Sequence, residues 1–211
     1  MNTFFMQKNI KNIIFDLGGV LLNINYLLTE QAFLELGIKD FRLVYSKAKQ
    51  SSLFDQFETG KISAHLFRNE LRKYLPKEIS DKEIDTAWNA MLLDFPLERV
   101  KLLRQLKNKY RIFLLSNTNE IHVNAFEQIF IRSFGSNIFE HIFEKHYYSN
   151  IIGLRKPNAD CFEYVLQQNQ LNPIETLFID DSEQHVAGAI QCGLKAIHLK
   201  ENETVNEILK I

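Results

Sequence analysis

The chain has 211 residues, of which 45% are hydrophobic and 24% are charged, and its formal net charge is −1. This composition is typical of a globular protein and excludes a disordered chain, which buries too little apolar surface to offset the entropy of ordering. The balanced charge excludes a broad basic surface, so we expect neither nucleic acid nor a membrane as a partner.

The first predicted element is a buried strand at 13–15, where the sequence reads Ile-Ile-Phe. A continuous apolar run of this length is typical of a strand covered by helices on both faces. From about 26 to 95 the chain shows one helical pattern after another and no further run of this kind. We therefore expect a small helical domain at 25–94, inserted into a core domain that consists of 1–24 and 95–211.

Helix start and stop signals recur along the chain. Ser80 is followed three residues later by Glu83, which is the spacing of a helix-capping box. Pro96 is placed to open a second helix, and a third pattern follows Pro157. A fourth covers about 183–191, shortly before a glycine that is placed to end it.

Three more short apolar runs alternate with these later helices. They lie at 112–115, 177–179 and 196–199. Strands that alternate with helices in this way are typical of βαβ units and a parallel sheet. The sequence therefore predicts an α/β fold with a doubly wound parallel sheet.

Polar clusters follow three of the four predicted strands. They contain Asp16, Ser116, Asn117, Asp180 and Asp181, and Lys156 precedes a helix start between the second and third clusters. In an open parallel sheet, ligands bind beyond the carboxyl ends of the strands, so these side chains are predicted to meet there. Several carboxylates in one crevice repel one another, and Mg²⁺ with oxygen ligands compensates such charge where phosphate also binds.

The segments FDLGGV, LLSNTN, GLRKP and FIDDS resemble, in order and spacing, the four motifs of the haloacid dehalogenase-like (HAD) hydrolases. The resemblance covers essentially the whole chain, because the helical insert matches the helical cap of that family. The Gly-Gly pair and the Phe-Glu-x-Gly turn are most similar to sugar phosphatases of the α-glucose-1-phosphate phosphatase kind. The resemblance implies a Rossmann-like core with a cap, and a phosphatase that acts on a small phosphorylated metabolite, with a sugar phosphate favoured.

The resemblance also implies a role for each polar residue. Asp16 attacks phosphorus and forms an aspartyl-phosphate, Lys156 pairs with Asp16 and with phosphate oxygens, and Ser116 holds the transferring oxygens. Asn117, Gly18 and Gly19 form the rest of the phosphate-binding site. The Mg²⁺ cofactor is implied to bind Asp16, the backbone carbonyl of Gly18, Asp180 and Asp181.

One position departs from the family pattern. Phosphatases that the chain resembles usually carry a second Asp two residues after the nucleophile, where it protonates the leaving oxygen and later activates water. Here that residue is Gly18, which cannot move a proton. General acid–base help contributes typically ~10²–10⁴-fold, so we expect a good leaving group to be favoured. Proton transfer through substrate or water, or through His122, is left open as a replacement.

Three other functions compete with a phosphatase. A catalytically weak or inactive HAD-fold binding or regulatory protein is the main alternative, because one catalytic group is missing. A 2-haloacid dehalogenase needs no metal, whereas Asp180 and Asp181 offer a metal site. A phosphomutase needs the absent second Asp as its proton shuttle.

The sequence also sets expectations for the cell compartment and the assembly. Cys161 and Cys192 show no metal-binding or redox spacing, so reduced thiols in the cytoplasm are expected. We expect a monomer or a homodimer. Asn25, Tyr26 and residues 54–57 are expected near the mouth of the site, where a cap would select the substrate.

Overall fold

The computed structural model of the protein describes residues 9–41, 52–136 and 139–209. The strands are β1 (Asn12–Phe15), β2 (Arg111–Ser116), β3 (Lys145–Tyr148), β4 (Thr176–Asp180) and β5 (Lys195–His198). The helices are α1 (Tyr26–Glu35), α3 (Leu53–Glu58), α4 (Ala64–Arg72), α5 (Asp81–Asn89), α6 (Leu97–Leu106), α7 (Glu120–Phe134), α8 (Phe139–Ile142), α9 (Ser149–Ile152), α10 (Ala159–Gln168), α11 (Glu183–Gln191) and α12 (Val205–Ile208), with the 3-10 helix η1 at Pro173–Glu175. Within these ranges, no helix has both the length and the hydrophobicity required to cross a bilayer.

The strands form one parallel sheet in the order β3-β2-β1-β4-β5. The predicted α/β fold with a doubly wound parallel sheet is confirmed, and the four predicted strands correspond to β1, β2, β4 and β5. The sequence analysis missed β3, which reads Lys-His-Tyr-Tyr and forms an edge of the sheet. Its first two side chains are exposed, so this strand has no apolar run to signal it.

Alternate side chains of β1 enter two different cores, as the period of a strand requires. Ile13 and Phe15 belong to a cluster with buried side chains of α6, α7 and α12. Ile14 belongs to a second cluster, with side chains of α10 and α11. The sheet is therefore covered by helices on both faces, which explains why residues 13–15 of its central strand are all apolar.

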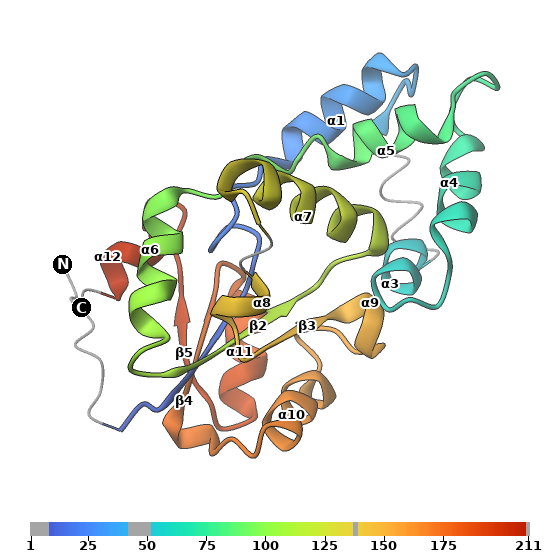
Figure 1. The fold of residues 1–211 in the computed structure, drawn as a ribbon. Helices are drawn as coiled ribbons and strands as arrows, with labels where there is room; N and C mark the ends of the chain where they lie inside the picture. The colour runs from blue at the N-terminus through green and yellow to red at the C-terminus, as the bar shows by residue number, and fades with distance from the viewer. Residues whose placement is uncertain (1–8, 42–51, 137–138, 210–211) are drawn as a thin grey trace.

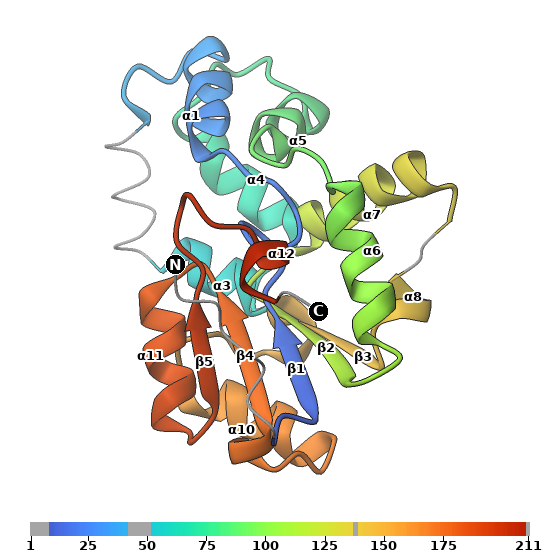
Figure 2. The ribbon, with the colours of Figure 1, turned by 90° about the vertical axis from the view of Figure 1, so that its left-hand side faces the viewer.

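The helices α1, α3, α4 and α5 have a core of their own. Their buried side chains form a third cluster, in which the rings of Phe57 and Phe67 stack with centroids 4.2 Å apart. Both ribbon views place α1, α4 and α5 together beyond one end of the sheet (Figures 1 and 2). The predicted capping box at Ser80 and Glu83 is present at the start of α5.

Two chain segments join these helices to the sheet, and they lie side by side. The Asn23 backbone N–H donates to the Asp94 carbonyl at 2.9 Å, and the Leu93 N–H donates to the Asn23 carbonyl at 3.0 Å. A further bond of 2.9 Å runs from the Asn25 N–H to the Met91 carbonyl. The predicted domain boundaries, 24/25 and 94/95, fall in this paired ribbon, and the division into two domains stays a prediction.

Candidate active site

The site forms where the chain reverses its direction across the sheet. β1 lies between β2 and β4, and at such a switch point the loops beyond the carboxyl ends of the strands diverge and leave a crevice. Asp16 directly follows β1, and its backbone N–H donates to the Ile179 carbonyl of β4 at 2.9 Å. Asp180 is the last residue of β4. Two of the predicted carboxylates are thus neighbours because their strands are neighbours.

Lys156 is completely buried between these two carboxylates. Its Nζ lies 2.6 Å from Oδ1 of Asp16 and 2.6 Å from Oδ2 of Asp180. Burial alone lowers the pKa of a lysine, but the two adjacent carboxylates outweigh burial and raise the pKa of Lys156. The side chain is therefore a fixed ammonium at the centre of the site.

The two carboxylates have different protonation properties. Burial raises the pKa of Asp16 to about 7, with Lys156 opposing the shift and the charges of Asp180 and Asp181 adding to it. Burial also disfavours ionised Asp180, but Lys156 and His185 outweigh it and lower the pKa of Asp180 to about 2. Asp180 is thus a permanent anion, whereas ionised Asp16 needs more positive charge than Lys156 supplies.

The third carboxylate, Asp181, completes a set of oxygen ligands. One carboxylate oxygen each from Asp16, Asp180 and Asp181 can be chosen so that all lie within 4.8 Å of one another. Burial and the charge of Asp180 raise the pKa of Asp181. Three carboxylates around one ammonium leave excess negative charge, and an all-oxygen donor set suits a hard divalent cation such as Mg²⁺.

The turn after Asp16 lies against this oxygen set. Gly19 has φ +76°, and a Cβ atom there would come within 2.1 Å of Oδ2 of Asp181. Gly18 does not have a positive φ, and a Cβ there would meet only the Ile24 side chain, at 3.3 Å. The Gly19 position therefore needs a glycine, whereas the backbone does not exclude a side chain at Gly18.

Ser116 and Asn117 end the neighbouring strand. Ser116 is the last residue of β2 and is buried. The Asn117 side chain donates from Nδ2 to the Lys156 carbonyl at 2.9 Å, and its Oδ1 accepts the Lys156 N–H at 3.0 Å. This two-point clamp fixes the backbone of Lys156, a task for the Asn117 side chain that the sequence analysis did not anticipate.

His185 is a further residue that sequence reasoning missed. It lies in the first turn of α11, and its Nδ1 is 3.0 Å from Oδ1 and 3.1 Å from Oδ2 of Asp180. The Ser182 N–H donates to Oδ1 of the same carboxylate at 2.8 Å. Lys156, Ser182 and His185 are thus the hydrogen-bond partners of the Asp180 carboxylate, and they hold it as an oriented anion. The sequence feature that could have indicated this contact is a histidine five residues after Asp180, in the first turn of the following helix.

His122 is not free to carry a proton. Oδ1 of Asn119 accepts the His122 backbone N–H at 3.0 Å, which turns Nδ2 of Asn119 toward Nδ1 of the ring, at 3.1 Å. Nδ1 is thus an acceptor, and Nε2 donates to the Trp88 carbonyl at 3.1 Å. Burial lowers the pKa of His122 to about 4. The structure argues against the replacement role considered for this histidine, which instead joins α7 to α5.

A cavity of about 410 Å³ lies between the cap helices, which are α1, α3, α4 and α5, and Asn117 after β2. Its lining is Tyr26, Leu27, Thr29, Glu30, Phe41, Phe54, Glu58, Trp88, Met91, Asn117 and His122. Of the residues predicted near the mouth, Tyr26 and Phe54 line this cavity, and Asn25 lines an adjoining one with Gly19 and Asp181. Phe57 instead lies in the core of the cap helices.

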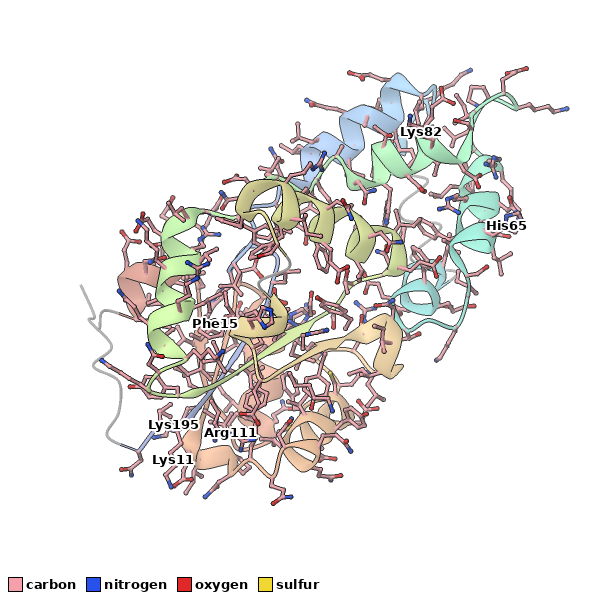
Figure 3. All side chains as sticks on the ribbon, in the orientation of Figure 1. Lys11, Phe15, His65, Lys82, Arg111 and Lys195 are labelled. Carbon is pink, nitrogen blue, oxygen red and sulfur yellow. The ribbon has the colours of Figure 1, made fainter. Side chains whose placement is uncertain are left out.

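A larger hollow, of about 780 Å³, lies at the other end of the sheet. Lys11 and Arg111 line it. Figure 3 places these two residues and Lys195 at this end of the molecule, far from His65 and Lys82. Lys11 is paired with Glu175, and Arg111 with Glu144. Two basic residues of this hollow are thus ion-paired, and the carboxylate set that could hold a metal ion lies at Asp16, Asp180 and Asp181 instead.

Comparison with known proteins gives the family of the chain. The family of haloacid dehalogenase-like hydrolases matches residues 10–193. A D-ribitol-5-phosphate phosphatase of Bacteroides thetaiotaomicron is 32% identical over 177 residues, which are 84% of this chain and 85% of that protein. A sesquiterpene phosphatase of Aspergillus oryzae is 27% identical over 198 residues, 93% of each chain.

A solved structure agrees with this result. A HAD-family enzyme of Bacteroides thetaiotaomicron, crystallised in complex with magnesium and inorganic phosphate, superposes with a TM-score of 0.86. It is 33% identical, and the superposition covers 95% of this chain and all of that one. The family predicted from the four sequence motifs is confirmed: the chain belongs to the haloacid dehalogenase-like hydrolases.

Proposed function

We propose that this hydrolase is a Mg²⁺-dependent phosphatase that cleaves a small phosphorylated metabolite through an aspartyl-phosphate on Asp16. The observation that carries the proposal is a cluster of three carboxylates at the carboxyl ends of β1 and β4, two of which bind the buried ammonium of Lys156. Two relatives are phosphatases by name, and a similar enzyme binds magnesium and inorganic phosphate. Both facts support the proposal.

Each residue of the site has a separate role in phosphoryl transfer. Asp16 attacks phosphorus in line, and the bond between phosphorus and the leaving oxygen breaks; water then attacks the aspartyl-phosphate, which frees phosphate and restores Asp16. Lys156 neutralises the attacking carboxylate and the phosphate oxygens, and Ser116 with the Asn117 backbone N–H holds these oxygens. The loop formed by Gly18 and Gly19 carries the remaining backbone contacts to phosphate.

Mg²⁺ would be held by Asp16, Asp180, Asp181 and the Gly18 carbonyl. When bound, the ion supplies positive charge to the phosphate oxygens in the transition state. The fit rests on this chain's own electrostatics, because the pKa values of both Asp16 and Asp181 are raised when no cation is present. A cation would restore both as ionised ligands.

The cavity above the site favours a small hydroxylated substrate. Its volume of about 410 Å³ suits a metabolite rather than a polymer. The ring of Trp88 stacks on Phe54, with centroids 5.6 Å apart, and forms an apolar wall, while Glu30, Glu58 and Asn117 offer polar contacts. Aromatic faces and carboxylates together suit the C–H faces and hydroxyl groups of a sugar or sugar-alcohol phosphate.

We also propose the division into a core domain (1–24 and 95–211) and a cap domain (25–94), with closure of the cap over the substrate. Two unpaired thiols, Cys161 and Cys192, support a reducing compartment, the cytoplasm. For assembly we propose a monomer or a homodimer.

Phosphate release tests the proposed function. The purified protein is assayed on a panel of sugar phosphates, sugar-alcohol phosphates and p-nitrophenyl phosphate, with Mg²⁺ and with EDTA. Release that needs Mg²⁺ is expected, with one class of ester preferred. Release of chloride from 2-chloropropionate would indicate a dehalogenase instead. A folded protein that binds Mg²⁺ and phosphate but hydrolyses no ester would contradict the proposal in favour of a binding role.

A further inference from the structure

A phosphatase with Gly18 after its nucleophile still needs a proton for the leaving oxygen and a base for the attacking water. The backbone at Gly18 does not forbid a side chain, so its absence is a property of this sequence and not of this turn. His122 is excluded because both its ring nitrogens are hydrogen-bonded in a neutral ring. With His122 excluded, a proton carrier supplied by the protein has to lie outside the core residues named so far; the alternative is transfer through the substrate or water.

Glu58 is a carboxyl group on the wall of the substrate cavity, which it shares with Asn117 of the phosphate site. It is the last residue of α3, and this end of the helix packs on the loop that carries Lys156. The Gly60 backbone approaches Asn150 so closely that a Cβ atom would come within 2.2 Å of the Asn150 carbonyl oxygen. Arg155, the residue before Lys156, lies 2.9 Å from Oε2 of Glu58.

One guanidinium serves two carboxylates at this contact. Arg155 also binds Asp55, one turn earlier on α3, through a hydrogen bond. Oε2 of Glu58 is buried and has no hydrogen-bond partner among the described residues, because the nearby Arg155 guanidinium is not aligned to donate to it. The Asp55 side chain is 62% exposed and the Glu58 side chain 25%, so water reaches Asp55 more freely than Glu58. Of the pair, Glu58 is the carboxyl group whose protonated form burial favours.

The charges around Glu58 agree with this assignment. Burial raises the pKa of Glu58, Asp55 adds to the rise, and Arg155 and Lys156 oppose it. Glu30, Tyr26 and the neutral His122 line the same cavity. A carboxyl group with a raised pKa at the edge of a phosphate site holds its proton more firmly than an exposed one, as a general acid must.

We infer that Glu58, from the cap, is the general acid and base that replaces the missing core aspartate; the inference rests on the proposed phosphatase function. In the first step the Glu58 carboxyl proton passes to the leaving oxygen as its bond to phosphorus breaks and the bond from Asp16 forms. In the second step Glu58 carboxylate takes a proton from water as the water oxygen bonds to phosphorus and the Asp16 bond breaks. Atoms and charge balance over the cycle, and Glu58 ends protonated.

The variant Glu58→Gln tests this role through the leaving group. An alkyl phosphate needs protonation of its leaving oxygen and p-nitrophenyl phosphate does not. For Glu58→Gln we expect kcat/KM to fall by roughly 10²–10⁴-fold on a sugar-alcohol phosphate and by less than about tenfold on p-nitrophenyl phosphate. Because water activation is also impaired, p-nitrophenol should appear as a burst of about one equivalent, followed by slow turnover. Equal losses of kcat/KM on both esters, without a burst, would overturn the inference.

The variant Asp55→Asn is a matched test in the same ion-pair cluster. With Asp55 neutral, Arg155 acts on Glu58 alone, which lowers the pKa of Glu58. The general acid must be protonated, so activity is lost as pH rises through that pKa, and the falling limb of the kcat/KM profile should move to lower pH. An unmoved limb would contradict the assignment, and this test does not depend on the folding of Glu58→Gln.

These outcomes are separate from a failure of the proposed function. If the wild type releases no phosphate with Mg²⁺ from any ester, the phosphatase itself is refuted. If the wild type is active and Glu58→Gln shows no dependence on the leaving group, only the role of Glu58 is refuted. Circular dichroism and Mg²⁺ titration of each variant exclude a loss of fold or of the metal site as the cause.

Discussion

Replacing Gly19 with Ala tests the metal site through a single methyl group. At φ +76° an alanine side chain costs roughly 1–2 kcal/mol of backbone strain. Its Cβ would also lie 2.1 Å from Oδ2 of Asp181, so the carboxylate has to move away from the oxygen set. Disturbing a ligand in this way weakens metal affinity by about 10–100-fold, or about 1.4–2.8 kcal/mol of binding free energy.

Gly135 provides the matched control. It follows α7 with φ +78°, and a Cβ atom there would meet nothing within 4 Å. Gly135→Ala therefore carries the same backbone strain without the contact to Asp181, and its loss of unfolding free energy measures the strain alone. The assay is the Mg²⁺ concentration that gives half-maximal phosphate release, measured beside thermal unfolding. An unchanged Mg²⁺ requirement in Gly19→Ala, or an equal rise in Gly135→Ala, would refute the reasoning.

Three further predictions concern the groups around Lys156 and α7. Lys156→Met leaves the two buried carboxylates of Asp16 and Asp180 without their cation. Phosphate release should vanish, and the unfolding free energy should fall by about 3–5 kcal/mol. An unchanged melting temperature would contradict this prediction. Asn117→Ala removes both hydrogen bonds to the Lys156 backbone. It should lower the unfolding free energy by about 2 kcal/mol and the rate of phosphate release by more than about tenfold. A wild-type rate of phosphate release would count against the clamp. His122 has a pKa of about 4 in the folded protein and about 6.5 in the unfolded chain. The unfolded chain therefore binds the proton first as pH drops. The unfolding free energy should fall by up to about 3 kcal/mol between pH 6.5 and pH 4. His122→Gln should remove this dependence in pH-resolved melting curves, and identical slopes for the two proteins would refute it.

Strands could be predicted from the sequence where burial on both faces requires a run of apolar residues. The central strand Asn12–Phe15 is covered on both faces, and its residues 13–15 form the apolar run that revealed it. The edge strand Lys145–Tyr148 lacks that constraint and reads as an ordinary polar segment. Helix signals were equally local, and the capping box at Ser80 was visible because its two partners are three residues apart.

The candidate site could be predicted only in part. Asp16, Lys156 and Asp180 each stand at the end of a recognisable element, and the sheet brings them together. Glu58 reaches the same region through an ion pair with Arg155, almost a hundred residues further along the chain, and no local pattern marks such a contact. The sequence was also unable to reveal that the nitrogens of His122 are occupied, because one of its partners is a backbone carbonyl of the cap helices.

The central claim is that Asp16 is the nucleophile. The most direct measurement is an acid quench of the protein during turnover of a phosphate-labelled substrate, followed by peptide mapping of the label. The account predicts an acid-stable, base-labile label on the peptide that carries Asp16, and neither label nor turnover in Asp16→Asn. A label on another residue, or phosphate release by Asp16→Asn at the wild-type rate, would contradict the account.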